Sequence, residues 1–130
     1  ETVEETAAFM VEAGIGPKAP IEALLARHDG IAVGFASFSK IFPADDGRLG
    51  VQMKDLFILP GERGQGIGGM LIRALANLCQ ERGYKRLFWT TTHENDAAIR
   101  LYDSLGAERQ NEKLHYRLNT AAIARLSESE

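Results

Sequence analysis

The densest chemical signal in the sequence is a set of four glycines within six residues, in the segment Arg63-Gly64-Gln65-Gly66-Ile67-Gly68-Gly69. The segment lies between an apolar run and a stretch whose apolar residues recur with helical spacing. The first amides of a helix have no intrahelical partners, and the helix dipole adds partial positive charge there. Glycines let a ligand approach the backbone because no Cβ intervenes. The segment therefore predicts a phosphate-binding loop at a helix N-terminus.

Three other interpretations of the glycines are weaker. The spacing Gly64-x-Gly66-x-x-Gly69 fits the dinucleotide fingerprint, but residues 59–63 separate the loop from its strand. Thr90–Thr92 also stand where that fingerprint needs an acidic residue, and several strands precede it. A Walker loop is excluded because no Gly-Lys-Ser or Gly-Lys-Thr follows. A turn without a ligand is disfavoured, since four glycines weaken the start of a helix.

A second interpretation of the same loop brings in a second motif. Arg63-x-x-Gly66-x-Gly68 follows the apolar segment Asp55–Ile58 and resembles the acetyl-coenzyme A signature of the GNAT family of N-acetyltransferases. The segment Asn95–Ala107, an Asn followed by an apolar helix with Tyr and Leu-Gly-Ala, resembles that family's second signature. The two motifs stand in the family's order. The resemblance covers about residues 21–118 and is nearest to the branch that acetylates diamines and polyamines.

Periodicity and turn residues predict the elements that must position these motifs. The capping-box pattern Thr2-Val3-Glu4-Glu5 favours a helix that ends near Gly14. In the remaining sequence we expect a loop over 14–20, a hairpin of strands over 21–27 and 31–39 joined at His28-Asp29-Gly30, a loop over 40–47, a strand over 49–59, a helix from 67 to Gly83, a strand over 86–92, a helix from 95 or 96 to Gly106, a pair of strands over 108–118 around Asn111-Glu112, and a partly helical polar tail over 119–130.

This order of elements is typical of an α/β or α+β fold. The resemblance implies a GNAT-like, mixed and mostly antiparallel central sheet flanked by helices, lacking the first strand and first helix of the fold. We expect a single acetyltransferase domain over residues 1–130, N-terminally incomplete, with 119–130 as its tail. An uncovered sheet edge favours self-association, so we expect a homodimer.

The resemblance implies acetyl-coenzyme A as co-substrate, with its pantetheine arm paired to the backbone of Leu56, Phe57 and Ile58. The diphosphate would then lie on the amides of residues 64–69, with Arg63 opening the loop. Asn95 would cap its helix, bond the pantetheine arm, or do both. The full set of expected cofactor-binding residues is Leu56, Phe57, Ile58, Arg63, Gly64, Gln65, Gly66, Ile67, Gly68, Gly69 and Asn95.

The resemblance also implies roles in catalysis. Tyr102 would protonate the departing thiolate when an amine attacks the thioester. Asp55, Glu94 and His93 are alternative bases that would deprotonate the amine through water. Lys54 stands where the polyamine branch carries a carboxylate, and His93 takes a second acidic position. A lysine there repels polyamines and favours a small-molecule amine that carries its own carboxylate.

Composition limits the remaining classes. The 130 residues carry a net charge of −3 with interspersed signs, which argues against non-specific binding to nucleic acid. One cysteine, Cys79, cannot form an internal disulfide and falls on an apolar helix face, and no apolar run is long enough to span a membrane. We expect a cytoplasmic enzyme without a metal. A non-catalytic coenzyme A-binding module and a dinucleotide-binding domain remain as alternatives.

Overall fold

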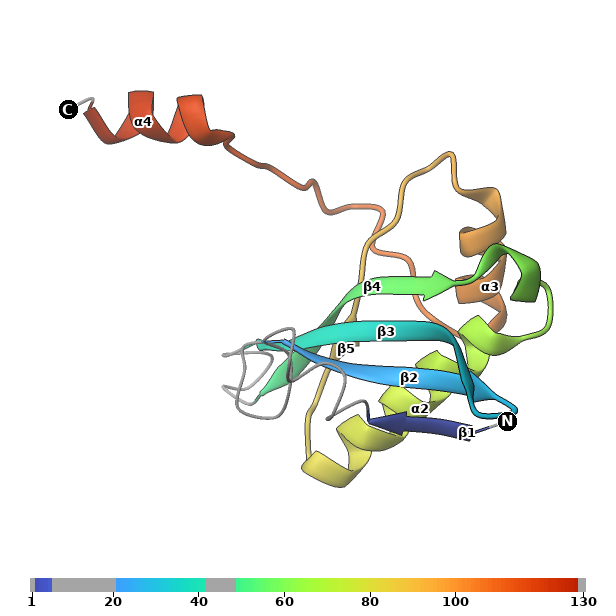
Figure 1. Cartoon of the computed structure of the whole chain (residues 1–130). Coiled ribbons are helices and arrows are strands. Elements are labelled where there is room, and N and C mark those ends of the chain that lie inside the picture. Colours follow the sequence, from blue (N-terminus) through green and yellow to red (C-terminus); the bar gives the residue numbers. More distant parts are fainter. Residues whose placement is uncertain (1, 6–20, 42–48, 129–130) are drawn as a thin grey trace.

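The computed structural model describes residues 2–5, 21–41 and 49–128, which build a five-stranded sheet in the order β1-β2-β3-β4-β5 (Figure 1). Neighbouring strands from β1 to β4 are antiparallel, whereas β5 is parallel to β4. The elements are β1 (Thr2–Glu5), β2 (Glu22–His28), β3 (Ile31–Ile41), β4 (Gly50–Ile58), the 3₁₀ turn η2 (Pro60–Glu62), α2 (Ile67–Arg82), β5 (Leu87–Phe88), α3 (Asp96–Ser104) and α4 (Thr120–Glu128). This arrangement confirms the expected mixed, mostly antiparallel sheet with flanking helices.

The β2–β3 hairpin forms where the sequence predicts it. Asp29 and Gly30 both have positive φ angles, 52° and 80°, and they connect His28 directly to Ile31. Two successive residues of this kind match the right-handed twist of the paired strands, which is why Asp-Gly favours a hairpin.

The core lies between the sheet and the apolar face of α2. Leu71 and Leu75 on the helix are fully buried, as are Phe38 on β3 and Val51 on β4. Each such side chain contributes roughly 1.5–3 kcal/mol when it leaves water. Cys79 belongs to this core, as expected, and burial raises the pKa of its thiol.

The far end of α2 is fixed by an ion pair and a glycine. The Arg82 guanidinium donates to Glu22 Oε2 at 2.9 Å, and that buried carboxylate raises the pKa of Arg82. Gly83 then ends the helix in the left-handed conformation, with φ 74°, as the sequence predicts. The ion pair therefore links the C-terminal end of α2 to β2.

A bulge in β4 resets the direction of its side chains. Ser37 on β3 pairs with Asp55, but the next residue, Phe38, pairs with Met53, so Lys54 is an extra residue on β4. Such an insertion shifts the alternation of side chains by one position. As a result Met53 and Leu56 both contact the core, while Lys54 and Asp55 between them are exposed.

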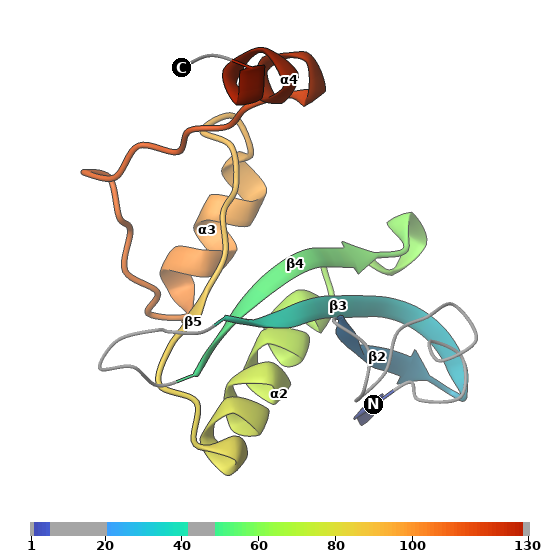
Figure 2. The same cartoon turned by 90° about the vertical axis from the view of Figure 1, so that its left-hand side faces the viewer.

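Strand β4 has a partner along its whole length on one side only. β3 pairs with it from Gly50 to Ile58, whereas β5 pairs only with Val51 and Gln52. Beyond Phe88 the chain turns away from β4, and the two separate in both views (Figures 1 and 2). The strand expected over 86–92 is thus shorter than predicted, because residues 89–92 have left the sheet.

Two predicted elements are wrong. Thr2–Glu5 form a strand rather than the start of a helix, because they pair antiparallel with residues 24–27 of β2. A capping-box pattern reflects only the local preference for a helix start. Pairing with β2 gives the backbone N–H and C=O groups of these residues hydrogen-bond partners without a helix. The remainder of that predicted helix lies outside the described residues, as do the loop over 14–20 and residues 42–48 of the next loop.

The pair of strands expected over 108–118 is also absent from the structure. That segment contains a turn at Asn111-Glu112 and an extended stretch, but it pairs with no described strand. The tail beyond it contains α4, in agreement with the expected partly helical tail. Within the described ranges, no helix has the length and apolar content that crossing a bilayer requires.

Candidate active site

The glycine loop joins the end of β4 to the start of α2. Gly64 and Gly66 both have φ near +81°, and a Cβ added to either would meet nothing within 4 Å. The backbone conformation itself therefore requires these two glycines, since other residues adopt positive φ angles only under strain. The space next to both residues is open, as a bound ligand would need.

Gly68 and Gly69 differ in their surroundings. A Cβ on Gly68 would lie 3.1 Å from Leu101 Cδ2, which is tighter than an ordinary contact, whereas one on Gly69 would lie 3.7 Å from Leu101 Cδ1, an ordinary contact distance. Gly68 therefore lets the Leu101 side chain of α3 pack against the first turn of α2. The sequence interpretation assigned all four glycines to the ligand, whereas the structure shows that Gly68 also positions α3.

The N-terminus of α2 carries no internal cap. Gly66 is the N-cap residue, offers no side-chain hydrogen bond, and no acidic residue occupies the first turn. The first intrahelical bond runs from the Met70 amide to the Gly66 carbonyl at 3.1 Å. The amides of residues 67–69 have no carbonyl partner within the helix, so this end of α2 favours an anion.

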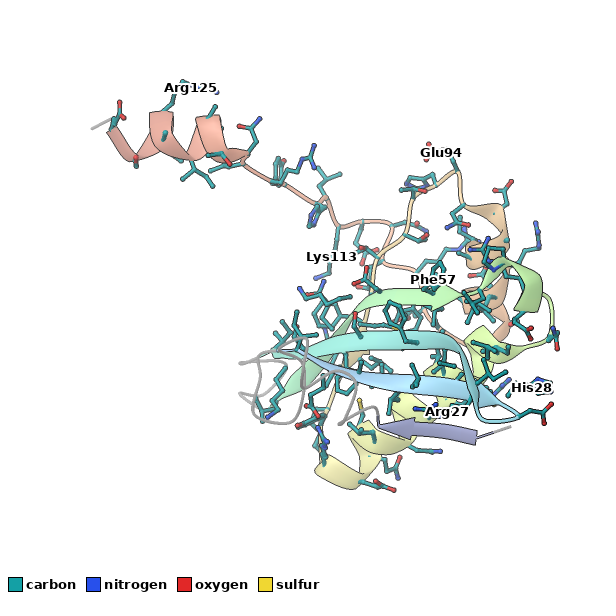
Figure 3. The ribbon with its side chains drawn as sticks, in the orientation of Figure 1. Arg27, His28, Phe57, Glu94, Lys113 and Arg125 are labelled. Carbon is teal, nitrogen blue, oxygen red and sulfur yellow. The ribbon has the colours of Figure 1, made fainter. Side chains whose placement is uncertain are left out.

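Arg63 is anchored beside this helix end. Its Nε donates to the Ile58 carbonyl at 3.0 Å, and its guanidinium lies 5.8 Å from the centre of the Phe57 ring. Figure 3 shows the labelled Phe57 on β4. A fixed positive charge at the end of the strand adds to the field of the helix N-terminus.

The backbone of β4 leads directly to this uncapped helix end. Residues 54–58 have β3 on one side, and on the other side no strand among the described residues pairs with them. Phe57 points to the face opposite the core and contacts Phe35, with ring centres 6.0 Å apart, while Leu56 and Ile58 pack against the core. The open edge can therefore pair with an extended ligand, as an added strand would.

Tyr102 is positioned by α3. The Asn95 Oδ1 accepts a hydrogen bond from the Ala98 amide at 3.2 Å, which confirms that Asn95 caps this helix. The Tyr102 ring packs edge-on against Trp89, with ring centres 5.2 Å apart. Partial burial raises the pKa of Tyr102, so its phenol is protonated at neutral pH and can donate a proton.

Asp55 is held by a residue that sequence analysis missed. Ser37 Oγ on β3 donates to Asp55 Oδ2 at 3.1 Å and accepts from the Asp55 amide, also at 3.1 Å. Ser37 is only 5% exposed. The sequence predicted the strand that carries Ser37, but the pairing of Ser37 with Asp55 depends on the β3–β4 register.

The other polar candidates lie in two places. Lys54, next to Asp55, is exposed and donates from Nζ to Gln52 Oε1 at 3.1 Å. His93 and Glu94 are exposed in the loop before α3, and Figure 3 shows Glu94 at the tip of that loop, away from Phe57. The structure thus groups Lys54 with Asp55 and does not bring Glu94 to them. Among the described residues, no cluster of side chains is suited to hold a metal ion.

Comparison with known proteins identifies the family. Residues 4–107 match the model of the acetyltransferase (GNAT) family. The chain belongs to this family, whose members use acetyl-coenzyme A as the acetyl donor.

Among curated proteins, the chain is 32% identical over 99 residues to YhfO, an uncharacterized N-acetyltransferase of Bacillus subtilis, covering 76% of this chain and 66% of that protein. It is 29% identical over 100 residues to the thialysine N-epsilon-acetyltransferase of Mus musculus, covering 75% and 58%. The matches to both proteins therefore span less than two thirds of the relative's length.

Solved structures support the fold. The integron cassette protein VCH_CASS6 from the mobile metagenome of V. cholerae superposes with a TM-score of 0.78 at 32% identity, covering 88% of this chain and 70% of that one. The aminoglycoside N-acetyltransferase AAC(6')-Iy, solved in complex with CoA, superposes with a TM-score of 0.75 at 22% identity, covering 91% and 99%.

The cap on α3 gives a first testable prediction. Replacing Asn95 with Ala removes a capping hydrogen bond worth about 1 kcal/mol, so α3 should be less stable. The Tyr102 ring should then lose part of its contact with the Trp89 ring. Because Trp89 is the only tryptophan, acrylamide quenching of its fluorescence reports this change directly, and we expect stronger quenching.

A matched control exists in the same chain. Asn119 Oδ1 accepts from the Ala122 amide and caps α4 in the same way. Asn119→Ala should therefore leave the quenching of Trp89 unchanged. Equal quenching of Asn95→Ala and the wild-type protein would contradict the positioning role of the α3 cap.

Proposed function

We propose that this protein transfers an acetyl group from acetyl-coenzyme A to a primary amine of a small molecule. The observation that carries the proposal is the continuous path from the open edge of β4 to the uncapped N-terminus of α2. An extended polar chain that ends in a diphosphate matches both parts of this path. Family membership supports the same donor.

In this proposal the residues of the path bind the donor. The backbone of Leu56, Phe57 and Ile58 pairs with the pantetheine arm, and the amides of residues 64–69 bind the diphosphate together with Arg63. Gln65 and Ile67 take part through their backbone. Amides of β4 polarise the thioester carbonyl, which stabilises the negative charge that develops there during attack.

The proposed reaction is a direct attack. The amine nitrogen forms a bond to the thioester carbonyl carbon, the carbon–sulfur bond breaks, and the departing sulfur takes a proton from Tyr102. The raised pKa of the half-buried phenol keeps that proton on Tyr102 at neutral pH. The position of Tyr102 supports this role, because α3 is capped by Asn95 and the Tyr102 ring packs against Trp89.

A base must first remove a proton from the amine, and Asp55 has the best supported position. Its carboxylate is exposed on β4, and Ser37 of β3 orients it through a hydrogen bond. Glu94 and His93 stay as alternatives that would act from the loop before α3. Proton removal by any of them through one water fits general base catalysis.

We propose that the acceptor amine carries its own carboxylate. The exposed Lys54 ammonium next to Asp55 attracts a carboxylate and repels a polyamine. The relative from Mus musculus is named for thialysine, an amino acid that has both an amine and a carboxylate. His93 would contribute to the same acceptor site if its loop approaches β4.

The cellular context is part of the proposal. We propose a single acetyltransferase domain that acts as a homodimer. The single cysteine is buried and free, which fits a reducing compartment such as the cytoplasm.

Ligand binding and thioester cleavage together test the function. At 100 times its dissociation constant, acetyl-coenzyme A should stabilise the protein by about 2.7 kcal/mol, or roughly 10 °C in thermal unfolding, whereas NADH should give no shift. A panel of amino-acid amines should then release free coenzyme A thiol, measured by its reaction with an aromatic disulfide. A shift with NADH alone would support a dinucleotide-binding domain, and a shift with acetyl-coenzyme A without thiol release would support a non-catalytic module.

Tyr102→Phe tests the proton donor. Phenylalanine keeps the packing against Trp89 but has no proton to give, so turnover should fall at least tenfold, within the roughly hundred- to ten-thousand-fold range of acid catalysis. Affinity for acetyl-coenzyme A should not change. Because burial raises the pKa of Tyr102 above the usual value near 10, only the wild-type rate should decline as the phenol ionises at still higher pH.

Tyr84→Phe serves as the control for Tyr102→Phe. Tyr84 follows the far end of α2, where its amide donates to the Cys79 carbonyl. This variant should keep the wild-type rate at every pH. A wild-type rate in Tyr102→Phe would remove the phenol from the mechanism.

Lys54→Glu tests the acceptor class. Reversing this charge should lower kcat/KM for an amino-acid amine and raise it for a polyamine, each by roughly tenfold, which corresponds to about 1.4 kcal/mol. Lys85→Glu changes an exposed lysine next to the start of β5 and should alter neither value. Unchanged selectivity in Lys54→Glu would show that Lys54 does not contact the acceptor.

A further inference from the structure

The gap between β4 and β5 is closed at one end. Val51 pairs with Leu87 and Gln52 with Phe88, and the two strands separate from the next residue onward. Both views show the chain after β5 running away from β4 (Figures 1 and 2). The closed end is tightly packed, because Val51 is fully buried and its amide donates to the Arg86 carbonyl at 2.8 Å. A ligand that lies along the open edge of β4 therefore cannot extend past this end.

The length of the open edge matches the length of the proposed donor's arm. The anion site begins beyond Ile58, whose carbonyl accepts from Arg63. From Met53, the first residue of β4 past the last pair with β5, to Ile58 the strand spans roughly 16 Å at about 3.3 Å per residue. The pantetheine arm has about thirteen bonds from sulfur to phosphorus, and at the reach of an extended peptide it also spans roughly 15 Å. An arm that starts at the anion site thus places its sulfur, with the acyl group bonded to it, at the closed end of the gap.

Trp89 borders this closed end on the core face of the sheet. It is the first residue after β5, and its side chain packs on the core together with that of Leu87. Phe88 between them points to the other face and is 37% exposed. The Trp89 ring lies edge-on to the Tyr102 ring, with ring centres 5.2 Å apart. Across the gap, Met53 belongs to the same apolar cluster and is buried.

The proposed chemistry brings the acyl group to the same place. If Tyr102 gives its proton to the departing sulfur, that sulfur lies within hydrogen-bond reach of the phenol. The acyl carbon is one bond from the sulfur, and the indole ring of Trp89 packs directly on Tyr102. The carbons beyond the acyl carbonyl therefore have Trp89 and Met53 as neighbours, with the paired ends of β4 and β5 behind them.

We propose that Trp89 sets the length of the acyl group that this protein transfers and limits it to the two carbons of acetyl. The inference rests on the proposed function and adds the acyl specificity of the donor. The glycine loop and the open edge do not determine that specificity, because they would bind parts that every acyl-coenzyme A shares. A longer acyl chain would have to displace the indole ring or the buried Met53 side chain, and overpacking of this kind is unfavourable.

Trp89 and the proposed base lie on opposite faces of the sheet. Ala36 and Phe38 of β3 belong to the core, so the Ser37 side chain between them points to the other face. Ser37 holds the exposed carboxylate of Asp55 on that face. The acceptor amine would therefore approach from the face of Asp55, while the acyl chain lies against Trp89. A change at Trp89 can thus alter the choice of donor without altering the groups proposed for the acceptor.

Rates with a series of donors test the limit. Acetyl-, propionyl- and butyryl-coenzyme A are compared with one acceptor amine by release of coenzyme A thiol. The wild-type kcat/KM should be at least roughly tenfold lower with butyryl- than with acetyl-coenzyme A. Trp89→Phe should narrow this ratio, and Trp89→Ala should remove or reverse it, because each methylene that reaches an apolar surface favours binding roughly fourfold. General damage to the fold would lower all three rates by the same factor, so unchanged ratios in both variants would overturn the proposal.

Phe88→Ala is the matched control for the Trp89 variants. It truncates the neighbouring aromatic side chain, which lies on the opposite face of the same strand. This variant should keep the wild-type preference for acetyl-coenzyme A. A loss of the preference in Phe88→Ala that the Trp89 variants do not show would place the limit on the other face and overturn the proposal. A wild-type protein that uses butyryl- as well as acetyl-coenzyme A would also overturn it.

The fluorescence of Trp89 gives a second test, which needs no acceptor amine. Trp89 is the only tryptophan in the chain, so emission excited beyond the absorption of adenine reports its surroundings alone. Saturating acetyl-coenzyme A should shift the emission to a shorter wavelength than saturating free coenzyme A does, because the acetyl group displaces water from the indole ring. Identical spectra with the two ligands would overturn the proposal even if acetyl transfer occurs. A spectral difference without thiol release would support the contact with Trp89 and contradict the proposed reaction.

Discussion

The unequal pairing of β4 is the constraint on which the rest of the site depends. β3 holds this strand along its full length, while β5 holds it only at Val51 and Gln52. Hydrogen bonding to β3 therefore holds β4 in place along one edge, while the other edge is open to a ligand beyond Gln52. Gly34 allows the close approach on the rigid side, because a Cβ there would lie 2.8 Å from the Phe57 carbonyl oxygen. The proposed donor site is therefore a gap in a sheet that the fold leaves unfilled.

The electrostatic character of the site follows from the end of that strand. The chain leaves β4 through η2 and a turn with two left-handed glycines, and α2 begins without a capping side chain. Arg63 bonds to the strand's last carbonyl and adds a fixed cation beside the helix. An anion is favoured here by backbone geometry as well as by charge, which suits a diphosphate better than a single carboxylate.

Gly68 also couples the donor site to the proposed chemistry. It lets Leu101 of α3 pack against the start of α2, and the next residue on α3 is Tyr102. The same helix turn that presents amides to an anion therefore sets the position of the proposed proton donor. Trp89 supports Tyr102 from the chain that leaves β5. The separation of β4 and β5 thus leaves an edge of β4 open for the proposed donor, and it also places Trp89 against the proposed proton donor, Tyr102.

Much of this arrangement could be predicted from the sequence, since it rests on local patterns. The Asp29-Gly30 hairpin, the helix from Ile67 to Gly83 and the Asn95 cap all form as expected, because turn residues and helical spacing act over a few residues. The glycine loop at the start of α2 also forms as predicted, for the same reason. Its chemistry depends on backbone conformation and on the start of a helix.

Long-range pairing decided what the sequence by itself could not. Thr2–Glu5 became a strand because β2 offered a ladder, and residues 89–92 and 108–118 did not extend the sheet because no described strand pairs with them. The bulge at Lys54 and the Ser37–Asp55 contact depend on the register of two strands that are distant in sequence. Local sequence therefore determined the loop, the caps and the helices. The tertiary structure decided which edges stay open, because hydrogen bonding between strands depends on what each edge meets.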